Sequence, residues 1–340
     1  MLRNRLPLLV TGVAGVAGYN AFHYFHRKYP GQVVGIRPHQ TFRLTGSGII
    51  GVDAEDALGV RQIFDEYGFG SVLNTIGNCA LKACELDPRM ARNVNVTSAD
   101  IISANARRVD ARVVHLSSDL VFSGTRSGNH VESDPVDPVT VYGKTMVEAE
   151  DLFFRRLPSV AVLRISLPMG PSFNRHAGAI DWIQSRFRAD RPATLYFDEI
   201  RCCTYCDDLN DVFERFLAGD AVGLFHCGGP RPMSLYQIAQ VINRVGGYMP
   251  ELLKGCPRID TGPMPPRAGD VSMSSAKLIS ELGFQPFQPW PMGEDIVPVD
   301  RRWHYDRPTD ACHSLQELTR RLYRYPMDSL AAECIIQKNA

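Results

Sequence analysis

Three glycines spaced three residues apart, Gly12, Gly15 and Gly18, interrupt an apolar run that begins at Leu8 and resumes at Tyr19. This order predicts a strand, a tight turn and a helix. Because glycine has no Cβ, such a turn lets a phosphate approach the backbone, and the first turn of the helix offers unpaired N–H groups. The spacing therefore predicts a binding site for the pyrophosphate of a dinucleotide.

The start of the chain also imitates a secretion signal, because the basic segment 1–5 precedes an apolar run. The glycines interrupt that run too early, and no convincing cleavage site follows. No later run reaches the roughly eighteen apolar residues that span a bilayer. We therefore expect a cytoplasmic protein without a membrane segment.

Composition supports a large core and gives little sign of a charged partner. Of the 340 residues, 44% are hydrophobic, and the formal net charge is zero. Such a balance predicts neither nucleic-acid nor membrane binding. The nine cysteines fit a reducing compartment. Cys202, Cys203 and Cys206 have no second ligand pair at zinc-like spacing, so we expect no metal.

Apolar runs bounded by turn residues alternate with longer helical patterns, which is typical of a parallel sheet covered by helices. The second strand is expected at 32–36, and Arg37 follows it. Dinucleotide folds usually place an acidic residue about twenty positions after the glycines, where it binds the ribose hydroxyls. Arginine instead suits a 2′-phosphate, so Arg37 favours NADP(H) over NAD(H).

The following strands are expected at 49–53, 71–77 and 112–118, with helices at 57–67 and 88–109. In an open parallel sheet, ligands bind beyond the carboxyl ends of the strands. Asp53, Ala54 and the turn from Thr75 to Asn78 should therefore flank the cofactor, and Ser117 and Ser118 should reach the same edge.

Ser118 begins the segment Ser-Asp-Leu-Val-Phe-Ser-Gly, and Tyr142 begins Tyr-Gly-Lys-Thr. With the glycine turn, these segments resemble the extended short-chain dehydrogenases/reductases, most closely the dTDP-4-dehydrorhamnose reductase branch. That branch also contains the regulatory beta subunit of methionine adenosyltransferase. Weaker similarities lie at 163–166, 204–209 and 267–278, so the resemblance covers roughly residues 7 to 285.

The resemblance implies hydride transfer between a nicotinamide cofactor and a sugar carbon. Ser118 would polarise the carbonyl and Tyr142 would donate or accept a proton. The family's lysine, four positions after the tyrosine, is here Met146, which supplies no charge. Lys144 lies about 200° around the helix from Tyr142, whereas the fourth residue lies about 40° away, so Lys144 should face elsewhere.

Met146 leaves three interpretations open. The protein is an enzyme acting on a sugar nucleotide (a reductase, epimerase or dehydratase) in which another charge or an altered mechanism assists Tyr142. Alternatively, it keeps the cofactor pocket and acts as a regulatory or binding subunit. Finally, the fold serves a different chemistry, or Tyr142 is structural. A methionine at this position is also compatible with simple core packing.

We expect a Rossmann-like, doubly wound parallel sheet over residues 1–165, with a returning segment at about 193–227. A smaller α/β substrate domain and a tail would comprise 166–192 and 228–340. Arg267, in a proline-rich loop, is expected to bind phosphate because the resemblance singles out this position and a guanidinium suits phosphate. The tail, with an amphipathic stretch at 315–325, is expected to pack on the small domain or to contact a second copy or a partner enzyme.

The predicted site residues fall into three groups. The catalytic pair is Ser118 and Tyr142, and a nucleotide sugar would contact Asn78, Ser118 and Arg267. The cofactor, NADP(H) or alternatively NAD(H), would contact Gly12, Val13, Ala14, Gly15, Val16, Ala17, Gly18, Arg37, Asp53, Ala54, Thr75, Ile76, Gly77, Ser117, Tyr142 and Met146.

Overall fold

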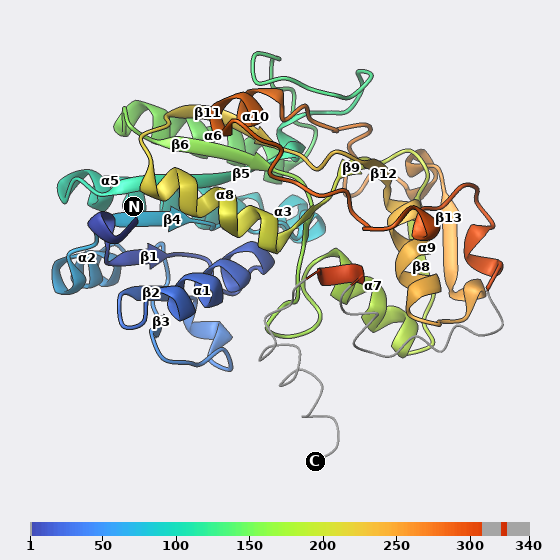
Figure 1. Ribbon diagram of the computed structural model, residues 1–340, viewed down its shortest axis with the longest axis horizontal. Coiled ribbons are helices and arrows are strands. Elements are labelled where there is room, and N and C mark those ends of the chain that lie inside the picture. The colour runs from blue at the N-terminus through green and yellow to red at the C-terminus, as the bar shows by residue number, and fades with distance from the viewer. Residues whose placement is uncertain (1, 308–320, 325–340) are drawn as a thin grey trace.

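A parallel sheet of seven strands forms the larger part of the molecule in the computed structural model, which describes residues 2–307 and 321–324 (Figure 1). Its strand order is β11-β6-β5-β4-β1-β2-β3, and every neighbouring pair is parallel. The strands are β1 (Leu8–Val10), β2 (Val33–Arg37), β3 (Ile49–Gly51), β4 (Ser71–Asn74), β5 (Arg112–Ser118), β6 (Ala161–Ile165) and β11 (Gly223–Cys227). The order reverses between β1 and β4, where α/β sheets bind ligands.

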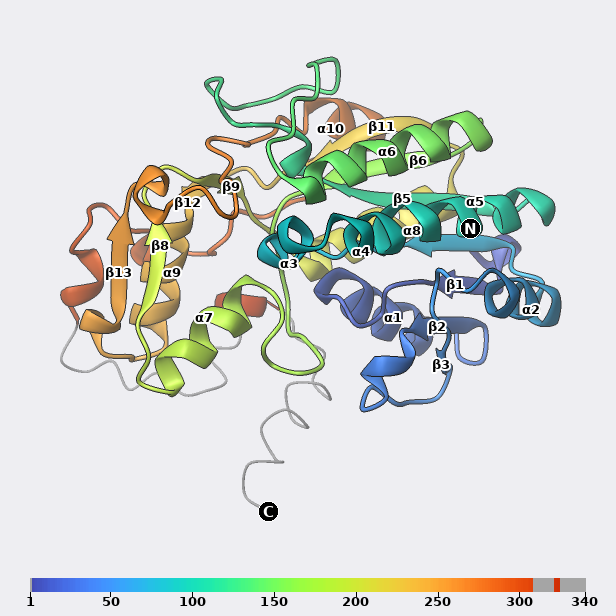
Figure 2. The ribbon, with the colours of Figure 1, turned by 180° about the vertical axis from the view of Figure 1, so that it is seen from behind.

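Helices cover both faces of this sheet (Figures 1 and 2). One face carries α1 (Val16–Lys28) and α8 (Cys206–Ala218), and the other carries α2 (Ala57–Tyr67), α5 (Ser98–Arg108) and α6 (Val141–Arg156). The short helix α10 (Ala276–Leu282) lies beside β11. This arrangement confirms the predicted doubly wound α/β fold.

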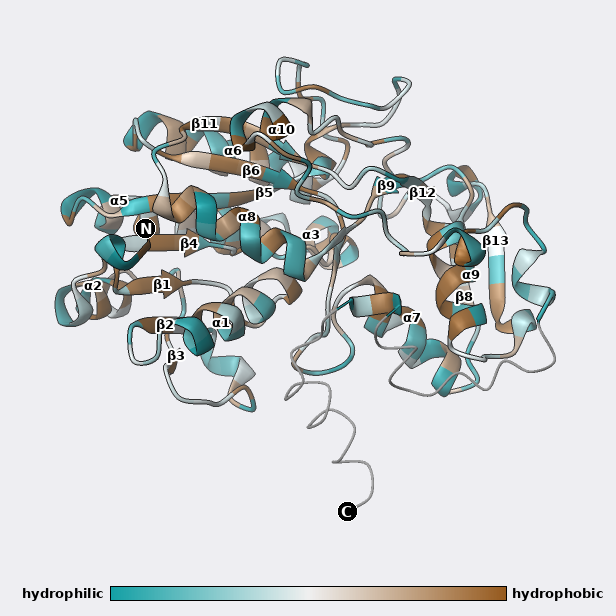
Figure 3. Ribbon diagram, viewed as in Figure 1, coloured by the Kyte–Doolittle hydropathy of each residue, from teal (hydrophilic) through white to brown (hydrophobic). Residues whose placement is uncertain are grey.

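The buried strands explain why both faces are covered. Along β1, Leu8 and Val10 join one apolar cluster with α1 and α8, whereas Leu9 joins the cluster under α2, α5 and α6. Side chains alternate between the faces of a strand, so an uninterrupted apolar run requires cover on both sides. Figure 3 shows these strands as hydrophobic ribbons between helices of mixed character.

The helix expected at 88–109 is formed in three parts. After α3 (Leu81–Leu86), the chain continues through α4 (Pro88–Arg92), a π-helical turn η3 (Asn93–Thr97) and α5. Asn95 in this turn is buried; its Oδ1 accepts from the Asn78 N–H (2.8 Å), and its Nδ2 donates to Thr145 Oγ1 (2.8 Å). The turn therefore ties the end of β4 to α6.

A smaller unit has its own core around α7 (Ala179–Arg188) and α9 (Leu235–Val245). Ser234 caps α9 in a capping box with Gln237. The remaining strands form three two-stranded pairs: β7 (Pro168–Met169) with β10 (Thr204–Tyr205), β8 (Ala193–Tyr196) with β13 (Leu253–Cys256), and β9 (Ile200–Cys202) with β12 (Pro232–Ser234). The short 3-10 turns are η1 (Leu2–Arg5), η2 (His39–Thr41), η4 (Asp119–Val121), η5 (Pro250–Leu252), η6 (Arg258–Thr261), η7 (Glu294–Ile296) and η8 (Trp303–Tyr305).

The segment that returns to the large sheet is shorter than the expected 193–227. Strand β8 pairs with β13 in the smaller unit, and the return consists of α8 and β11, residues 206–227. Parallel pairing with a strand some sixty residues later left no local signal in the sequence. The domain limits at 165 and 228 remain predictions.

The chain after residue 285 packs mainly on the smaller unit. Trp290, Trp303 and Leu322 are buried in its core, and the Trp290 indole N–H donates to the Leu322 carbonyl (3.1 Å). Most of the amphipathic stretch expected at 315–325 lies outside the described residues. Within the described part of the chain, every helix is too short or too polar to cross a membrane.

Two buried histidines predict a loss of stability in mild acid. Burial lowers the pKa of His115 from 6.5 to about 3, and burial also lowers that of His226. Both stay neutral in the fold while the unfolded chain takes up protons below its ordinary pKa of about 6.5. The two histidines therefore contribute fully to the free energy of unfolding above pH ~6.5. Below that pH, the free energy of unfolding falls by about 1.4 kcal/mol per pH unit for each histidine.

Urea unfolding at a series of pH values between 7 and 4 measures this slope. The slope of the free energy of unfolding against pH counts the protons taken up on unfolding. His115→Asn should lower this count by one, whereas His176→Asn, at an exposed histidine, should not change it. An equal slope in the His115 variant and the unmodified protein would contradict the conclusion that His115 is neutral in the folded protein.

Candidate active site

The glycine turn joins β1 to α1, and its three glycines have different structural roles. Gly12 has φ +66°, and a Cβ on it would lie 2.8 Å from Thr75 Oγ1. A Cβ on Gly18 would overlap the Gly12 carbonyl and the Thr75 hydroxyl. Gly15 is exposed, and a Cβ there would meet only the Gly12 oxygen at 3.4 Å. Gly12 and Gly18 thus permit close packing, and Gly15 leaves the N-terminus of α1 open.

A line of polar side chains holds the strand ends beneath this turn in register. Thr11 Oγ1 donates to Asn74 Oδ1 (2.6 Å), and Asn74 Nδ2 donates to His115 Nδ1 (2.9 Å). Thr75 Oγ1 donates to the Thr11 carbonyl (2.7 Å). These bonds connect the carboxyl ends of β1 and β4 with the middle of β5. The carboxyl ends of the strands are where a ligand of an open parallel sheet binds.

The other residues predicted from the turn and strand ends lie along this edge. Val13, Val16, Ala54 and Ser117 are buried, and Ala14, Ala17, Thr75 and Ile76 are half-buried. The buried Ser117 hydroxyl has no hydrogen-bond partner among the described residues.

Arg37 and Asp53 stand at the ends of the neighbouring strands β2 and β3. Arg37 Nε donates to the Leu44 carbonyl (2.6 Å) and Nη1 to the Pro38 carbonyl (3.1 Å). Asp53 accepts from the His39 N–H (2.9 Å) and pairs with its Nδ1 (2.8 Å). Burial raises the pKa of Asp53, but these bonds outweigh it and hold the pKa below its usual value.

Tyr142 and Met146 lie one turn apart on α6 and both border Gly77 after β4. A Cβ on Gly77 would be 3.6 Å from Met146 Sδ and 3.7 Å from the Tyr142 hydroxyl. Both side chains are buried, whereas Lys144 is exposed. The expectation that Lys144 faces elsewhere is confirmed.

Ser118, at the end of β5, donates its hydroxyl to Asp119 Oδ1 (3.1 Å) and accepts from the Leu120 N–H (3.1 Å). Its hydroxyl also lies close enough to the Tyr142 hydroxyl to interact with it. Burial raises the pKa of Tyr142 above its usual range, and the nearby Cys79 thiol and Asp119 carboxylate raise it further. The bond with Ser118 and the charge of Arg201 lower it. At neutral pH Tyr142 therefore carries its proton beside a second hydroxyl.

The family of this chain follows from a match to the family model "RmlD substrate binding domain" over residues 6–293. The chain belongs to the RmlD substrate binding domain family. The predicted place in the dTDP-4-dehydrorhamnose reductase-like branch is thereby confirmed.

Two curated proteins and one solved structure show what this chain is similar to. A dTDP-4-dehydrorhamnose reductase of Aggregatibacter actinomycetemcomitans is 26% identical over 242 residues, covering 67% of this chain and 80% of that protein. The methionine adenosyltransferase 2 subunit beta of Xenopus tropicalis is 24% identical over 258 residues, covering 73% and 76%. The crystal structure of dTDP-4-dehydrorhamnose reductase from Bacillus anthracis in complex with NADP has the same fold, with a TM-score of 0.69 at 17% identity over 83% of this chain and 95% of that chain.

Two residues predicted to bind substrate have protein partners in this RmlD-family chain. Asn78 Nδ2 donates to Met90 Sδ (3.2 Å), and Asn78 Oδ1 accepts from the Ala80 N–H (3.1 Å). The Arg267 guanidinium lies 4.7 Å from the centre of the Tyr196 ring and 3.8 Å from Glu199. The structure thus places Arg267 against the smaller unit, and Asn78 between β4 and α3.

Sequence reasoning missed a buried group of charges beside Ser118. Arg201 on β9 donates to Asp119 Oδ1 (2.7 Å) and to Glu199 Oε1 (2.8 Å). The sequence shows Asp119 only as part of a motif and gives Arg201 and Glu199 no assigned role. The sequence feature that could have indicated this group is the charged pair Glu199 and Arg201, which flanks Ile200 and precedes a segment rich in cysteine.

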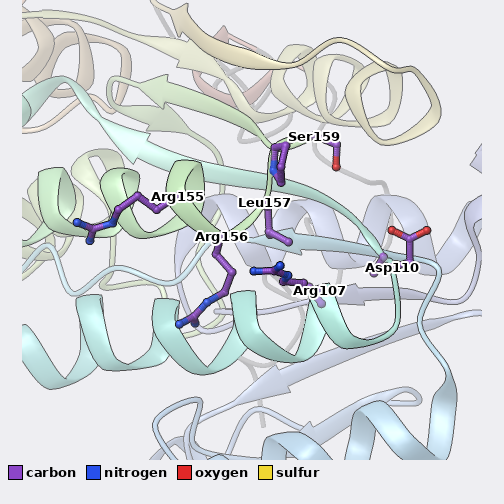
Figure 4. A pocket seen from close by; sticks show the side chains of 9 residues that line it. Arg107, Asp110, Arg155, Arg156, Leu157 and Ser159 are labelled. Carbon is purple, nitrogen blue, oxygen red and sulfur yellow. The ribbon is translucent and has the colours of Figure 1, made fainter.

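A hollow of about 360 Å³ lies at the opposite edge of the sheet, where α5 and α6 end (Figure 4). Arg156 in its lining pairs with Asp100 (2.8 Å), and Figure 4 shows Arg155 directed away from Arg107 and Arg156. None of the predicted site residues lines it. Among residues 2–307 and 321–324, no group of three His, Cys, Asp or Glu side chains is placed to hold a metal ion.

The glycine roles predict different effects of two substitutions in one turn. Gly18→Ala should destabilise the protein by about 1–3 kcal/mol, because the added methyl group forces α1 away from β1 and β4. Gly15→Ala should change the free energy of unfolding by less, since its Cβ has room. Urea unfolding of both variants is the measurement, and equal losses would show that Gly18 is not a packing contact.

Proposed function

We propose that the protein is an NAD(P)(H)-dependent reductase that acts on the keto sugar of a sugar nucleotide. The observation that carries this proposal is the hydroxyl pair of Ser118 and Tyr142, which lies at the carboxyl edge of the sheet near the glycine turn. Similarity to reductases of dTDP-linked keto sugars supports the choice of substrate class.

The edge of the sheet fits a dinucleotide. The exposed Gly15 leaves the N–H groups of α1 open to a pyrophosphate, and the buried Ser117 hydroxyl lacks a partner among the described residues. Arg37 Nη2 bonds to none of the described residues and is available for a 2′-phosphate, which favours NADP(H) with NAD(H) as the alternative. When bound, the nicotinamide supplies the hydride.

The residues around Gly77 would divide the remaining tasks. The hydroxyl of Ser118 donates a hydrogen bond to the sugar carbonyl oxygen, and Tyr142 gives its proton to that oxygen as negative charge develops. Met146 packs where the nicotinamide ribose would lie but offers no charge or donor. Asn78 and Arg267 are the proposed substrate contacts, with Arg267 on the phosphates.

A second candidate function is that of a cofactor-holding regulatory or binding subunit. Met146 is the observation in its favour, because a lysine at this position would both bind the ribose and lower the pKa of Tyr142. Similarity to the methionine adenosyltransferase 2 subunit beta points the same way. We propose the reductase first because Ser118 and Tyr142 are both retained and paired.

Tyr142→Phe tests the reductase directly. The variant should lose about 100-fold or more of the NADPH-dependent reduction of a dTDP-4-keto-6-deoxy sugar, because the proton donor is gone while the ring remains. NADPH binding should change little. Tyr305→Phe, at a partly exposed tyrosine of the smaller unit, is the matched control. Unchanged turnover in the Tyr142 variant would remove Tyr142 from the reaction.

Arg37→Ala tests the cofactor preference. The affinity for NADPH should fall roughly tenfold or more, because the 2′-phosphate loses a charge-assisted hydrogen bond, and the affinity for NADH should stay the same. Fluorescence titration with each cofactor measures both constants. Arg61→Ala, which removes an exposed arginine of α2, is the control. An equal loss for both cofactors would contradict a role at the 2′-phosphate.

A further inference from the structure

A buried ionic group lies where the smaller unit meets the catalytic edge. Arg201 Nη1 donates to Asp119 Oδ1 (2.7 Å) and Nη2 to Glu199 Oε1 (2.8 Å), and the three side chains are at most 5% exposed. Ser166 Oγ donates to the other Asp119 oxygen (2.6 Å). Asp119 follows β5 of the large sheet, whereas Arg201 lies on β9, so the group joins the two units.

One carboxylate oxygen links this group to the catalytic pair. Asp119 Oδ1 accepts from Arg201 and also from Ser118 Oγ (3.1 Å), and Ser118 is paired with Tyr142. An unpaired carboxylate would bind the Ser118 proton strongly, because hydrogen bonds to ionised acceptors are about twice as strong as neutral ones. Pairing Asp119 with a guanidinium weakens the hold of this carboxylate on the Ser118 proton, so that a substrate oxygen can compete for it.

The charge of Arg201 also reaches the tyrosine. Met146 brings no charge to Tyr142, and Lys144 on the same helix is exposed. Among the described residues, the Cys79 thiol, Asp119 and Arg201 are the charged or titratable groups that act most on Tyr142. Cys79 and Asp119 raise the pKa of Tyr142, whereas Arg201 lowers it.

We propose that Arg201 is the positioning residue for the Ser118–Tyr142 pair: it neutralises Asp119, weakens the hold of that carboxylate on the Ser118 proton, and supplies the positive charge that Met146 lacks. This role deepens the proposed reductase and rests on it for its chemical meaning. Because Arg201 comes from β9, the pair has its full electrostatic environment only when the smaller unit is docked.

The test is the ionisation of Tyr142 in the full chain without cofactor or substrate. Incorporating 3,5-difluorotyrosine at position 142 acidifies the phenol into a titratable range, and fluorine NMR follows it with pH. Arg201→Met should raise the midpoint by about one pH unit, and Asp119→Asn should lower it by about the same amount. A purely structural role would not move the two midpoints in opposite directions.

Three further variants keep the test decisive. Arg201→Lys keeps the charge and should leave the midpoint near that of the unmodified chain. Met146→Lys in the Arg201→Met background should bring it back down. Arg258→Met, which removes an arginine paired with Asp198 (3.0 Å), is the control and should have no effect.

The outcomes separate this inference from the proposed function. Unchanged midpoints in both Arg201→Met and Asp119→Asn, or shifts in the same direction, would overturn the role of Arg201. If Arg201→Met fails to fold, the lowered midpoint in Asp119→Asn is the expected result, and an unchanged midpoint there overturns the proposal. Failure of NADPH to bind would instead overturn the reductase, and the titration would still report on Arg201.

Discussion

The structure depends on the close approach of α1 to the ends of β1 and β4. Gly12 and Gly18 permit that approach, because a Cβ on either would strike Thr75 or the turn itself. Thr11, Asn74 and His115 then hold the strand ends in register through side-chain hydrogen bonds. The N-terminus of α1 and the hydroxyls at the end of β5 thus share one edge of the sheet, which a binding site for a phosphate and a carbonyl needs.

The positive charge at the carboxyl edge of the sheet does not come from a lysine one turn after the tyrosine, as it does in a tyrosine–lysine pair. The buried Tyr142 has Met146 one turn later, and the positive charge comes from Arg201 on another unit, already bound to two carboxylates. Removing one partner from such a buried group is costly, since it leaves an uncompensated charge in a poorly solvated place. This coupling makes the protonation of the hydroxyl pair sensitive to how the two units are joined.

The sequence predicted what local patterns encode. The apolar run at 112–118 predicts β5 at its observed limits, and the helix predicted at 57–67 is α2. The glycine turn, Ser118 and Tyr142 also came from short motifs, and their positions at the sheet edge follow from the parallel topology. The π turn holding Asn95, the pairing of β8 with β13, and the bond from Arg201 to Asp119 were missed. Each depends on a tertiary contact between segments distant in sequence, which no local pattern reports.

Calorimetric titration of the full chain with NADPH, alone and with a dTDP-linked sugar present, tests the central claim most directly. The account predicts that NADPH binds and that its affinity rises when the sugar nucleotide is present, because both ligands meet at the Ser118–Tyr142 pair. No heat of NADPH binding under either condition would contradict it. An affinity for NADPH that does not change with any dTDP- or UDP-sugar would contradict the reductase and favour the regulatory subunit.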